Sequence, residues 1–267
     1  MAASLRDVPD WRDGAAYAPL FDADRSFFAW EWLRRDVAYG ADATGRAGAP
    51  GGVDEGALRW RLHAFELAHR AVPDARPLWT AAADPFVLAA EAGAPTGRED
   101  FDLAGLAGWS TLVTALDGRQ HLLISDGFRA VRIDVLAGSL ARGPAGVRYH
   151  LAGLRSAECS VLTLRRFLAL WRSGAFRRSL HPRESRARRW ILMLRACDAI
   201  AAGATQREIA SALLSAEARQ PRWRGEAPSL RSRAQRLVRS ARAMESGGFW
   251  GLLGGDATRH GLLPHTE

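Results

Sequence analysis

Apolar residues in the last third of the chain recur every three or four positions, which is the spacing of amphipathic helices. This pattern predicts one helix that starts at Ser160, a second over Glu184–Ala202 and a third that starts at Thr205. Gly203 is placed to end the second helix, because glycine readily adopts the left-handed conformation of a helix C-terminus. Thr205 and Glu208 have the spacing of a capping box, which marks the start of the third helix.

A fourth helix is predicted after Pro228, with Ser229 as its cap and Glu245 near its end, and its two sides differ in polarity. Gly247-Gly248 follows it and ends it. The apolar side comprises Leu230, Ala234, Leu237, Val238, Ala241 and Met244. The opposite side comprises Arg231, Ser232, Gln235, Arg236, Arg239 and Arg242. An arginine-rich outer side on a helix whose other side is buried is typical of proteins that bind phosphate groups.

The middle of the chain has short apolar runs instead of helical spacing. The runs are Leu112–Leu116, His121–Ser125, Arg129–Val135 and Val147–Leu151, with an extension at Phe86–Leu88. Asp-Gly pairs separate the first three runs, at Asp117-Gly118 and Asp126-Gly127. Because both residues of such a turn tolerate positive φ, Asp-Gly between apolar runs indicates a β-hairpin. We therefore predict a small antiparallel sheet.

The N-terminal region is rich in aromatic residues between positions 8 and 40. It predicts a helix over Phe27–Val37, with Asp24 or Ser26 as its cap, and a second helix over Leu58–Arg70. Residues 40–57 are rich in Gly, Ala and Asp and are predicted to form a flexible linker. The aromatic face is expected to form a core.

These patterns together predict an α+β protein in four parts. They are a mainly helical aromatic domain (1–75), a small antiparallel β region (76–155), a C-terminal helix-turn-helix DNA-binding domain (156–253) and a disordered tail (254–267). The short Phe249–Leu253 segment is expected to fold back onto the helices.

Charge is divided unevenly between the two halves of the chain, which has 37 basic residues and a net charge of +8. All the basic residues are arginine; residues 1–150 hold 16 of them against 20 Asp and Glu (−4), whereas residues 151–267 hold 21 against 9 (+12). The basic half is the candidate for binding a polyanion, and the acidic half for contacting protein.

The spacing of the C-terminal helices resembles a helix-turn-helix, in which apolar contacts hold a recognition helix so that its polar side enters the major groove. We predict that Arg231, Gln235 and Arg239 contact bases, because arginine pairs with guanine and glutamine with adenine. Thr205, Gln206 and Arg207 lie at a helix N-terminus, which favours a phosphate. The remaining residues of the predicted DNA-binding surface on this helix are Ser232, Arg236 and Arg242. The alternative interpretation of the recognition helix is a solvated basic face of a structural bundle.

About a dozen residues, 215–227, separate these two helices, whereas a tight turn joins them in the simplest motif. The insert carries Arg219, Arg222 and Arg224. It is either a wing that contacts DNA or a solvated loop, and its sequence does not distinguish the two.

Enzymatic motifs are missing. The chain has no lysine and hence no P-loop, no HExxH pair and no GxSxG elbow, and its tyrosines lie outside the basic C-terminal region, which argues against a tyrosine recombinase. Cys197 is on an apolar helix face and is interpreted as a buried structural thiol. We expect no cofactor and no metal site. The N-terminus lacks an apolar signal core and no run is long enough to span a membrane, so we expect a cytoplasmic, nucleoid-associated protein.

Several segments resemble a two-domain family of proteobacterial regulators. The N-terminal segments are Val8–Arg12, Tyr17 and Phe27–Arg35. The others are His121–Leu123, Leu162–Phe167, Ala187–Trp190, Ala202–Ala210, Leu230–Arg233 and, more weakly, Ser246–Phe249. The family is that of the FseA-like transcriptional activators of integrative and conjugative elements. The resemblance implies a DNA-binding activator that turns on an excisionase gene and that a small antiactivator protein can inhibit.

Two hypotheses follow. The first is a transcription activator that binds double-stranded DNA through its C-terminal helices and contacts RNA polymerase or another protein through its N-terminal half. The second is a protein-interaction module or antiactivator that keeps a helix-turn-helix fold without contacting DNA.

Overall fold

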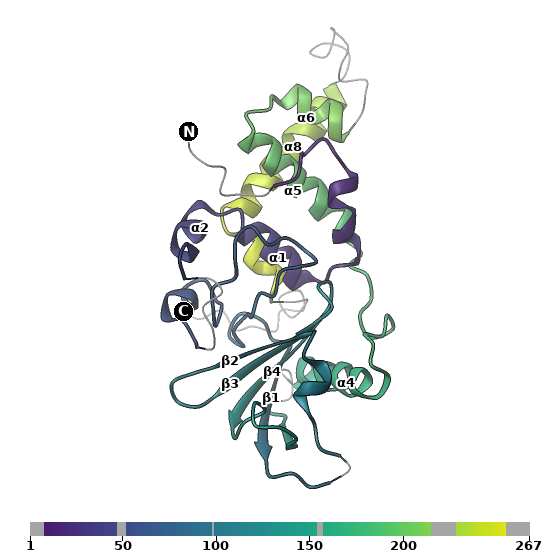
Figure 1. The fold of residues 1–267 in the computed structure, drawn as a ribbon. Helices are drawn as coiled ribbons and strands as arrows, with labels where there is room; N and C mark the ends of the chain where they lie inside the picture. The colour runs from purple at the N-terminus through teal and green to yellow at the C-terminus, as the bar shows by residue number, and fades with distance from the viewer. Residues whose placement is uncertain (1–7, 47–51, 98, 154–156, 215–227, 255–267) are drawn as a thin grey trace.

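The computed structural model describes residues 8–46, 52–97, 99–153, 157–214 and 228–254. Helices from the two ends of the chain lie together in one part of the molecule, and a β-sheet with one helix against it forms the other part (Figure 1). The structure is therefore α+β, as the sequence predicts. None of the described helices combines the length and the hydropathy that a bilayer span requires.

The N-terminal part contains a 3₁₀ helix η1 (Ala15–Asp22), then α1 (Arg25–Leu33), α2 (Val37–Ala43) and the short α3 (Glu55–Leu58). The predicted helix over Phe27–Val37 is thus two helices. Asp24 caps α1 by accepting bonds from the N–H groups of Ser26 and Phe27. Asp36, whose backbone is extended (ψ 127°), ends the helical run and caps α2 in the same way.

The predicted helix over Leu58–Arg70 is wrong: α3 ends at Leu58 and the chain then turns. Arg61 has a positive φ of 62°, and Leu62 forms a β-bridge with Trp79. Side chains then bond the backbone of this segment, for example the Tyr39 hydroxyl, which donates to the carbonyl of Glu66. Its aromatic residues Trp60 and Phe65 pack around the Tyr39 ring instead of on one helical face. The predicted linker over 40–57 is partly helical, and its residues 47–51 lie outside the described residues.

The sheet has five strands in the order β2-β3-β4-β1-β5. Their bounds are Val87–Gly93 (β1), Ser110–Thr114 (β2), Gln120–Ser125 (β3), Ala130–Ala137 (β4) and Gly146–His150 (β5). The glycines of both predicted Asp-Gly turns have positive φ, 84° at Gly118 and 92° at Gly127. The prediction of a wholly antiparallel sheet is wrong in one place, since β1 and β4 pair in parallel. Strands β2, β3 and β4 form a meander, and β4 is the strand of this meander that pairs with β1. The β1–β4 pair therefore joins strands that are not consecutive in the sequence.

The two faces of the sheet have different chemistry. Leu122, Ile124 and Ile133 lie in an apolar cluster with Phe167 of α4 (Ala157–Ser173). The opposite face joins the core of the N-terminal part through residues such as Leu123. That face also carries polar side chains that lie at alternate positions of β3 and β4, namely His121, Arg132 and Asp134.

The described residues of the C-terminal part form α5 (Ala187–Ala201), α6 (Gln206–Leu213), α8 (Pro228–Glu245) and the 3₁₀ turn η4 (Gly248–Leu252). Gly203 has a φ of 76° in the corner between α5 and α6, as expected of a residue that ends a helix. The predicted capping box of Thr205 and Glu208 is present. Ser229, predicted as the cap of the last helix, instead lies within its first turn.

One hydrophobic core joins the two ends of the chain. Phe28 of α1 packs edge-on against Trp190 of α5, with ring centroids 5.0 Å apart. Trp250 of η4 packs edge-on against Trp79, with ring centroids 6.1 Å apart, so the Phe249–Leu253 segment folds back onto the core as expected. The predicted domain boundaries at 75, 155 and 253 stay predictions, and residues 255–267 of the predicted tail lie outside the described residues.

Candidate nucleic-acid interface

Helix α8 presents opposite chemistry on its two sides, as its sequence predicts. Leu230, Ala234 and Val238 are buried where α8 packs against α5 and α6. The outer residues Arg231, Gln235, Arg236, Arg239 and Arg242 are exposed, and Ser232 is half-buried. No arginine of α8 forms an ion pair with a carboxylate of the described residues. Their charge is therefore available to an external anion.

A groove between α5 and α8 adds two arginines that the sequence-based prediction missed. Its lining includes Arg188 and Arg189 from α5 and Arg236 and Arg239 from α8. The buried side chain of Met193 lies at the same groove. The two α5 arginines are exposed and directly precede the buried Trp190. The position of Arg188 and Arg189 directly before a buried tryptophan indicates that they lie at the edge of the core. The sequence does not show that α8 faces them across a groove.

The first turn of α6 supplies the other predicted contacts. Gln206 and Arg207 are exposed there. Thr205 uses its hydroxyl within the cap, since Oγ1 lies 2.8 Å from Glu208 Oε2 and 3.3 Å from the Glu208 backbone nitrogen. The Thr205 backbone N–H also donates to Glu208 Oε2 at 2.8 Å, and this bond, together with that of the hydroxyl, holds the pKa of Glu208 below its ordinary value, so a carboxylate already occupies this helix N-terminus. Thr205 is therefore a capping residue, and its DNA contact stays a prediction.

Arg219, Arg222 and Arg224 lie in residues 215–227, outside the described residues. Whether this insert is a wing or a solvated loop stays open. The candidate interface as described consists of the outer face of α8, the α5–α8 groove and the start of α6, which lie together at one end of the molecule (Figure 1).

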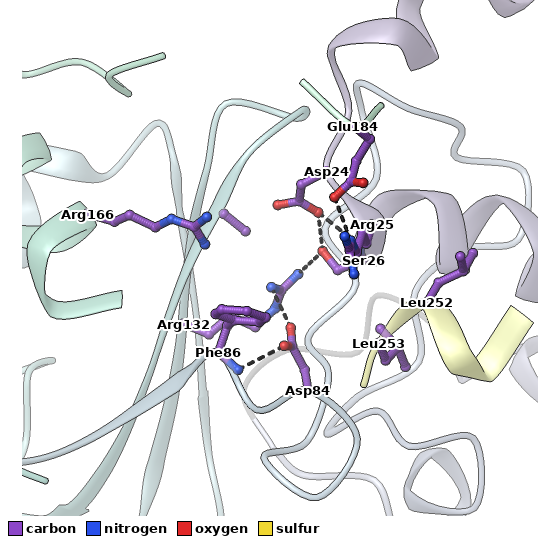
Figure 2. A pocket seen from close by; sticks show the side chains of 11 residues that line it. Asp24, Arg25, Ser26, Asp84, Phe86, Arg132, Arg166, Glu184, Leu252 and Leu253 are labelled. Carbon is purple, nitrogen blue, oxygen red and sulfur yellow. Dashed lines mark hydrogen bonds and ion pairs between the residues drawn. The ribbon is translucent and has the colours of Figure 1, made fainter. Parts of the chain in front are cut away.

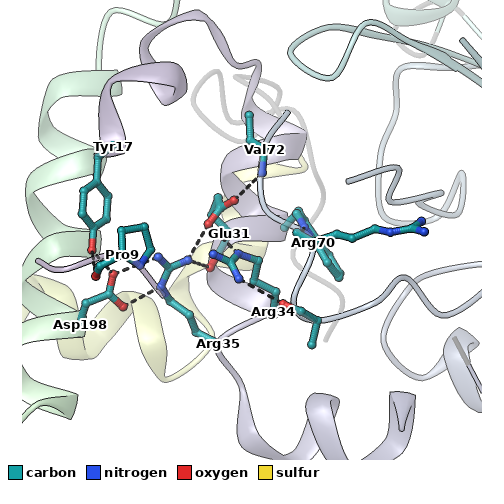
Figure 3. A network of polar contacts seen from close by, with 10 residues as sticks. Pro9, Tyr17, Glu31, Arg34, Arg35, Arg70, Val72 and Asp198 are labelled. Atoms are coloured by element: carbon teal, nitrogen blue, oxygen red, sulfur yellow. Dashed lines mark hydrogen bonds and ion pairs between the residues drawn. The ribbon is translucent and has the colours of Figure 1, made fainter. Parts of the chain in front are cut away.

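A buried polar network, which we call the seam, joins the N-terminal helices to α5 (Figure 3). Arg35 donates from Nε to Asp198 Oδ1 at 2.7 Å and from Nη2 to Asp198 Oδ2 at 2.9 Å. Arg35 also lies 2.6 Å from Glu31 Oε2, which accepts a bond from Arg34 at 2.8 Å. The Tyr17 hydroxyl completes the seam by donating to Asp198 at 2.6 Å.

The charges of the seam compensate one another. Burial alone would raise the pKa of Glu31, but Arg34 and Arg35 hold it below its ordinary value. Burial likewise opposes the charge of Arg35, yet Asp198 and Glu31 raise its pKa. The hydroxyl of Tyr17 keeps its proton, because burial and the adjacent Asp198 carboxylate raise its pKa. Such a fully paired network holds two segments in a defined geometry.

A pocket of about 250 Å³ lies where the N-terminal helices, the sheet and η4 meet (Figure 2). Arg132 of β4 donates to Asp84 at 2.9 Å and to the Ser26 hydroxyl at 2.8 Å. Arg25 donates to Glu184, just before α5, at 2.6 Å. These bonds connect the sheet and the segment before α5 to the start of α1, so a second polar connection supports the placement of the helices.

Cys197 is buried in α5, and burial raises the pKa of its thiol to about 12. A thiol of that pKa is almost fully protonated at neutral pH and makes a poor nucleophile. The geometry agrees with the interpretation of Cys197 as a structural residue.

Two protein-family models match segments of this chain. Residues 10–63 match a proteobacterial transcriptional regulator-like domain. Residues 152–253 match the RovC-type family described as "T6SS, Transcription factor, DNA binding domain". No curated protein matches the chain. The two matches indicate a two-domain, DNA-binding transcription regulator, and DNA is its partner.

The matches coincide with the geometry. The α5–α8 groove and the outer face of α8 lie within the second match. The seam joins the two matched segments, since Tyr17, Glu31 and Arg35 belong to the first and Asp198 to the second.

Proposed function

We propose that this DNA-binding regulator is a transcriptional activator that reads its operator with the outer face of α8. The observation that carries the proposal is the row of exposed side chains, without a carboxylate partner among the described residues, on a helix whose opposite side is buried. Such a helix is held firmly enough to place side chains against base edges. Its guanidinium groups provide the bidentate donors that guanine and phosphate accept.

Different residues of the interface are assigned different contacts. Arg231, Gln235 and Arg239 follow one another at intervals of four along α8, so they share one stripe and are assigned to bases. Arg236 shares the groove with Arg188 and Arg189, and these three are assigned to the phosphate backbone. Arg242, Gln206 and Arg207 are assigned to phosphates at the margins.

The N-terminal half is proposed to contact the transcription machinery. Its net charge is −4, against +12 for residues 151–267, which disfavours contact with the same DNA. Its large aromatic residues are mostly in the core, so the contact surface is acidic rather than aromatic. RNA polymerase and a small antiactivator protein are the proposed partners. The resemblance to the FseA-like activators supports genes for excision and transfer of a mobile element as the targets.

The operator is found first, by immunoprecipitating the protein with bound DNA from its host and sequencing that DNA. A binding titration then compares the wild type with the combined substitutions Arg231→Ala, Arg236→Ala and Arg239→Ala. We expect a loss of affinity for the operator of more than about 100-fold, since each well-placed contact contributes about 1–3 kcal/mol.

A matched control removes the same charge from the far end of the sheet, through Arg119→Ala, Arg142→Ala and Arg148→Ala, all at exposed residues. This control should bind the operator like the wild type. Equal losses in both triple variants would mean that net charge alone drives binding. Unchanged binding and unchanged promoter output in the α8 variant would support the alternative of a protein-interaction module or antiactivator.

The activator assignment is tested separately. A reporter fused to each bound promoter is measured with and without the protein. Higher output from a promoter of an excision gene would support the proposal, whereas lower output would identify a repressor.

A further inference from the structure

Three side chains that are far apart in the sequence meet between the N-terminal part and the sheet. His63 lies in the segment after α3, His121 on β3 and Asp134 on β4. His121 and Asp134 are directly opposite each other in the antiparallel β3–β4 pair, so their side chains emerge on the same face. His63 is brought to that face by its backbone, whose N–H donates to Leu78 and whose carbonyl accepts from Asp54, both at 2.9 Å.

The cluster is compact. The ligand atoms of the three residues all lie within 4.8 Å of one another. The two imidazole rings are stacked, with centroids 3.4 Å apart and planes 17° from parallel. His121 Nδ1 lies 2.7 Å from Asp134 Oδ1.

His63 supplies an independent observation. The residue is only 8% exposed. Its Nε2 atom is buried and has no hydrogen-bond partner among the described residues. Buried polar atoms in folded proteins are almost always paired, so an orphan of this kind calls for a partner from outside the chain.

We propose that His63, His121 and Asp134 bind one divalent transition-metal ion of the zinc class. A tetrahedral ion with bonds of about 2.0–2.1 Å spaces its ligand atoms about 3.3 Å apart, so the three side chains lie close enough to share one ion. An imidazole nitrogen binds a metal in the plane of its ring, so binding requires the two rings to rotate out of their stacked arrangement. Two imidazoles and one carboxylate suit zinc and its neighbours, whereas calcium and magnesium prefer oxygen ligands alone. A tetrahedral ion held by these three residues keeps its fourth position for water or another donor.

Such an ion would link the segment after α3 to strands β3 and β4. Asp134 would exchange its bond with His121 for a bond to the metal, and the orphan nitrogen of His63 would gain a partner. The side chains of His121 and Asp134 are 11% and 18% exposed, which leaves a route for the ion from solvent.

The test uses the untagged full chain, stripped with a chelator and titrated with Zn²⁺ by calorimetry. Metal content after gel filtration gives the stoichiometry. We expect one equivalent per chain, with affinity at least about tenfold lower in His63→Ala, His121→Ala and Asp134→Asn. His69→Ala is the matched control, because His69 is an exposed histidine six positions after His63, and it should bind like the wild type.

Two further readouts guard against variants that merely misfold. Co²⁺ in place of Zn²⁺ should give the visible absorption of a tetrahedral site in the wild type and in the His69 control only. Zn²⁺ should also raise the unfolding temperature of the wild type and leave that of Asp134→Asn unchanged, a variant that keeps the size and shape of the side chain. No saturable binding by the wild type, or binding that persists unchanged in folded Asp134→Asn and His63→Ala, would overturn the proposal.

Discussion

The seam and the outer face of α8 use the same side chain for opposite purposes. In the seam, Arg34 and Arg35 are almost fully buried and bond to Glu31 and Asp198. On α8 the arginines are exposed and have no carboxylate partner among the described residues. In a chain whose basic residues are all arginine, composition cannot separate the two roles. The neighbouring carboxylates distinguish the two roles. A guanidinium that is paired with a carboxylate stabilises the fold, whereas one without such a partner can bind an external anion.

The two regions should therefore respond differently to substitution. Removing one partner of a buried network leaves an uncompensated charge, which strongly lowers the free energy of unfolding. Removing an exposed arginine has little effect on folding and appears in binding instead.

The largest effect is expected at the seam. Asp198→Ala should lower the free energy of unfolding by about 3–5 kcal/mol, because Arg35 would keep a buried charge with one carboxylate fewer. Urea denaturation measures the change. Arg119→Ala is the control, since its ion pair with Asp117 is on the surface, and it should leave the unfolding midpoint nearly unchanged. Equal midpoints for the two variants would contradict the structural role of the seam.

A smaller effect is expected for base recognition. Gln235→Ala should reduce the preference for the operator over single-base variants by about 1–3 kcal/mol, because one bidentate base contact is lost. Competition binding against the variant duplexes measures the preference. Urea denaturation should show unchanged stability, because the side chain is exposed. Undiminished discrimination in this variant would remove Gln235 from the base-reading stripe.

Phosphate contact by the groove predicts a change in salt dependence. Arg188→Ala with Arg189→Ala should lower the slope of log affinity against log salt by about two, one for each phosphate contact, with little change in base preference. The matched control is Arg177→Ala with Arg178→Ala, another adjacent and exposed pair. If both pairs shift the slope equally, the α5–α8 groove is not a particular DNA site.

A buried ionisable side chain can also lose its charge, as His181 does. Burial and the nearby Arg166 lower its pKa to about 3, from an ordinary value of 6.5. As the pH falls, the imidazole of His181 therefore gains a proton in the unfolded chain before it does so in the folded chain. The contribution of the neutral His181 to stability is complete above pH 6.5 and is lost as the pH falls from 6.5 towards 3. The loss is about 1.4 kcal/mol per pH unit for one proton. Denaturation of His181→Gln across this range should show a shallower pH dependence than the wild type; parallel curves would contradict the assignment.

Local features of the fold could be predicted from the sequence. The two sides of α8, the capping box at Thr205 and the glycine turns at 118 and 127 each depend on residues within a few positions of one another. Features that depend on residues far apart in the sequence could not be predicted. The Leu58–Arg70 segment has helical spacing, but its aromatic residues pack around Tyr39. The β1–β4 pair joins residues 45 positions apart, such as Val87 and Arg132.

The same limit applies to the candidate site. Arg231, Gln235 and Arg239 were identified because a single helix displays them. Arg188 and Arg189 become part of the interface only when α5 meets α8. Arg35 has a local partner in Glu31, four positions earlier, but its bond to Asp198 and the His63–His121–Asp134 cluster depend on tertiary contacts, which no local spacing predicts.

The core shared by the two ends of the chain has a consequence for biosynthesis. Phe28 and its aromatic neighbours leave the ribosome early, but Trp190 and Phe249, which lie in the same core, are translated more than 150 residues later. The nascent chain must keep that apolar surface uncovered until the last helices emerge, during which it is a target for chaperones and a source of aggregation. Expression of an N-terminal fragment alone should consequently yield insoluble protein, and co-expression with the missing helices should rescue it.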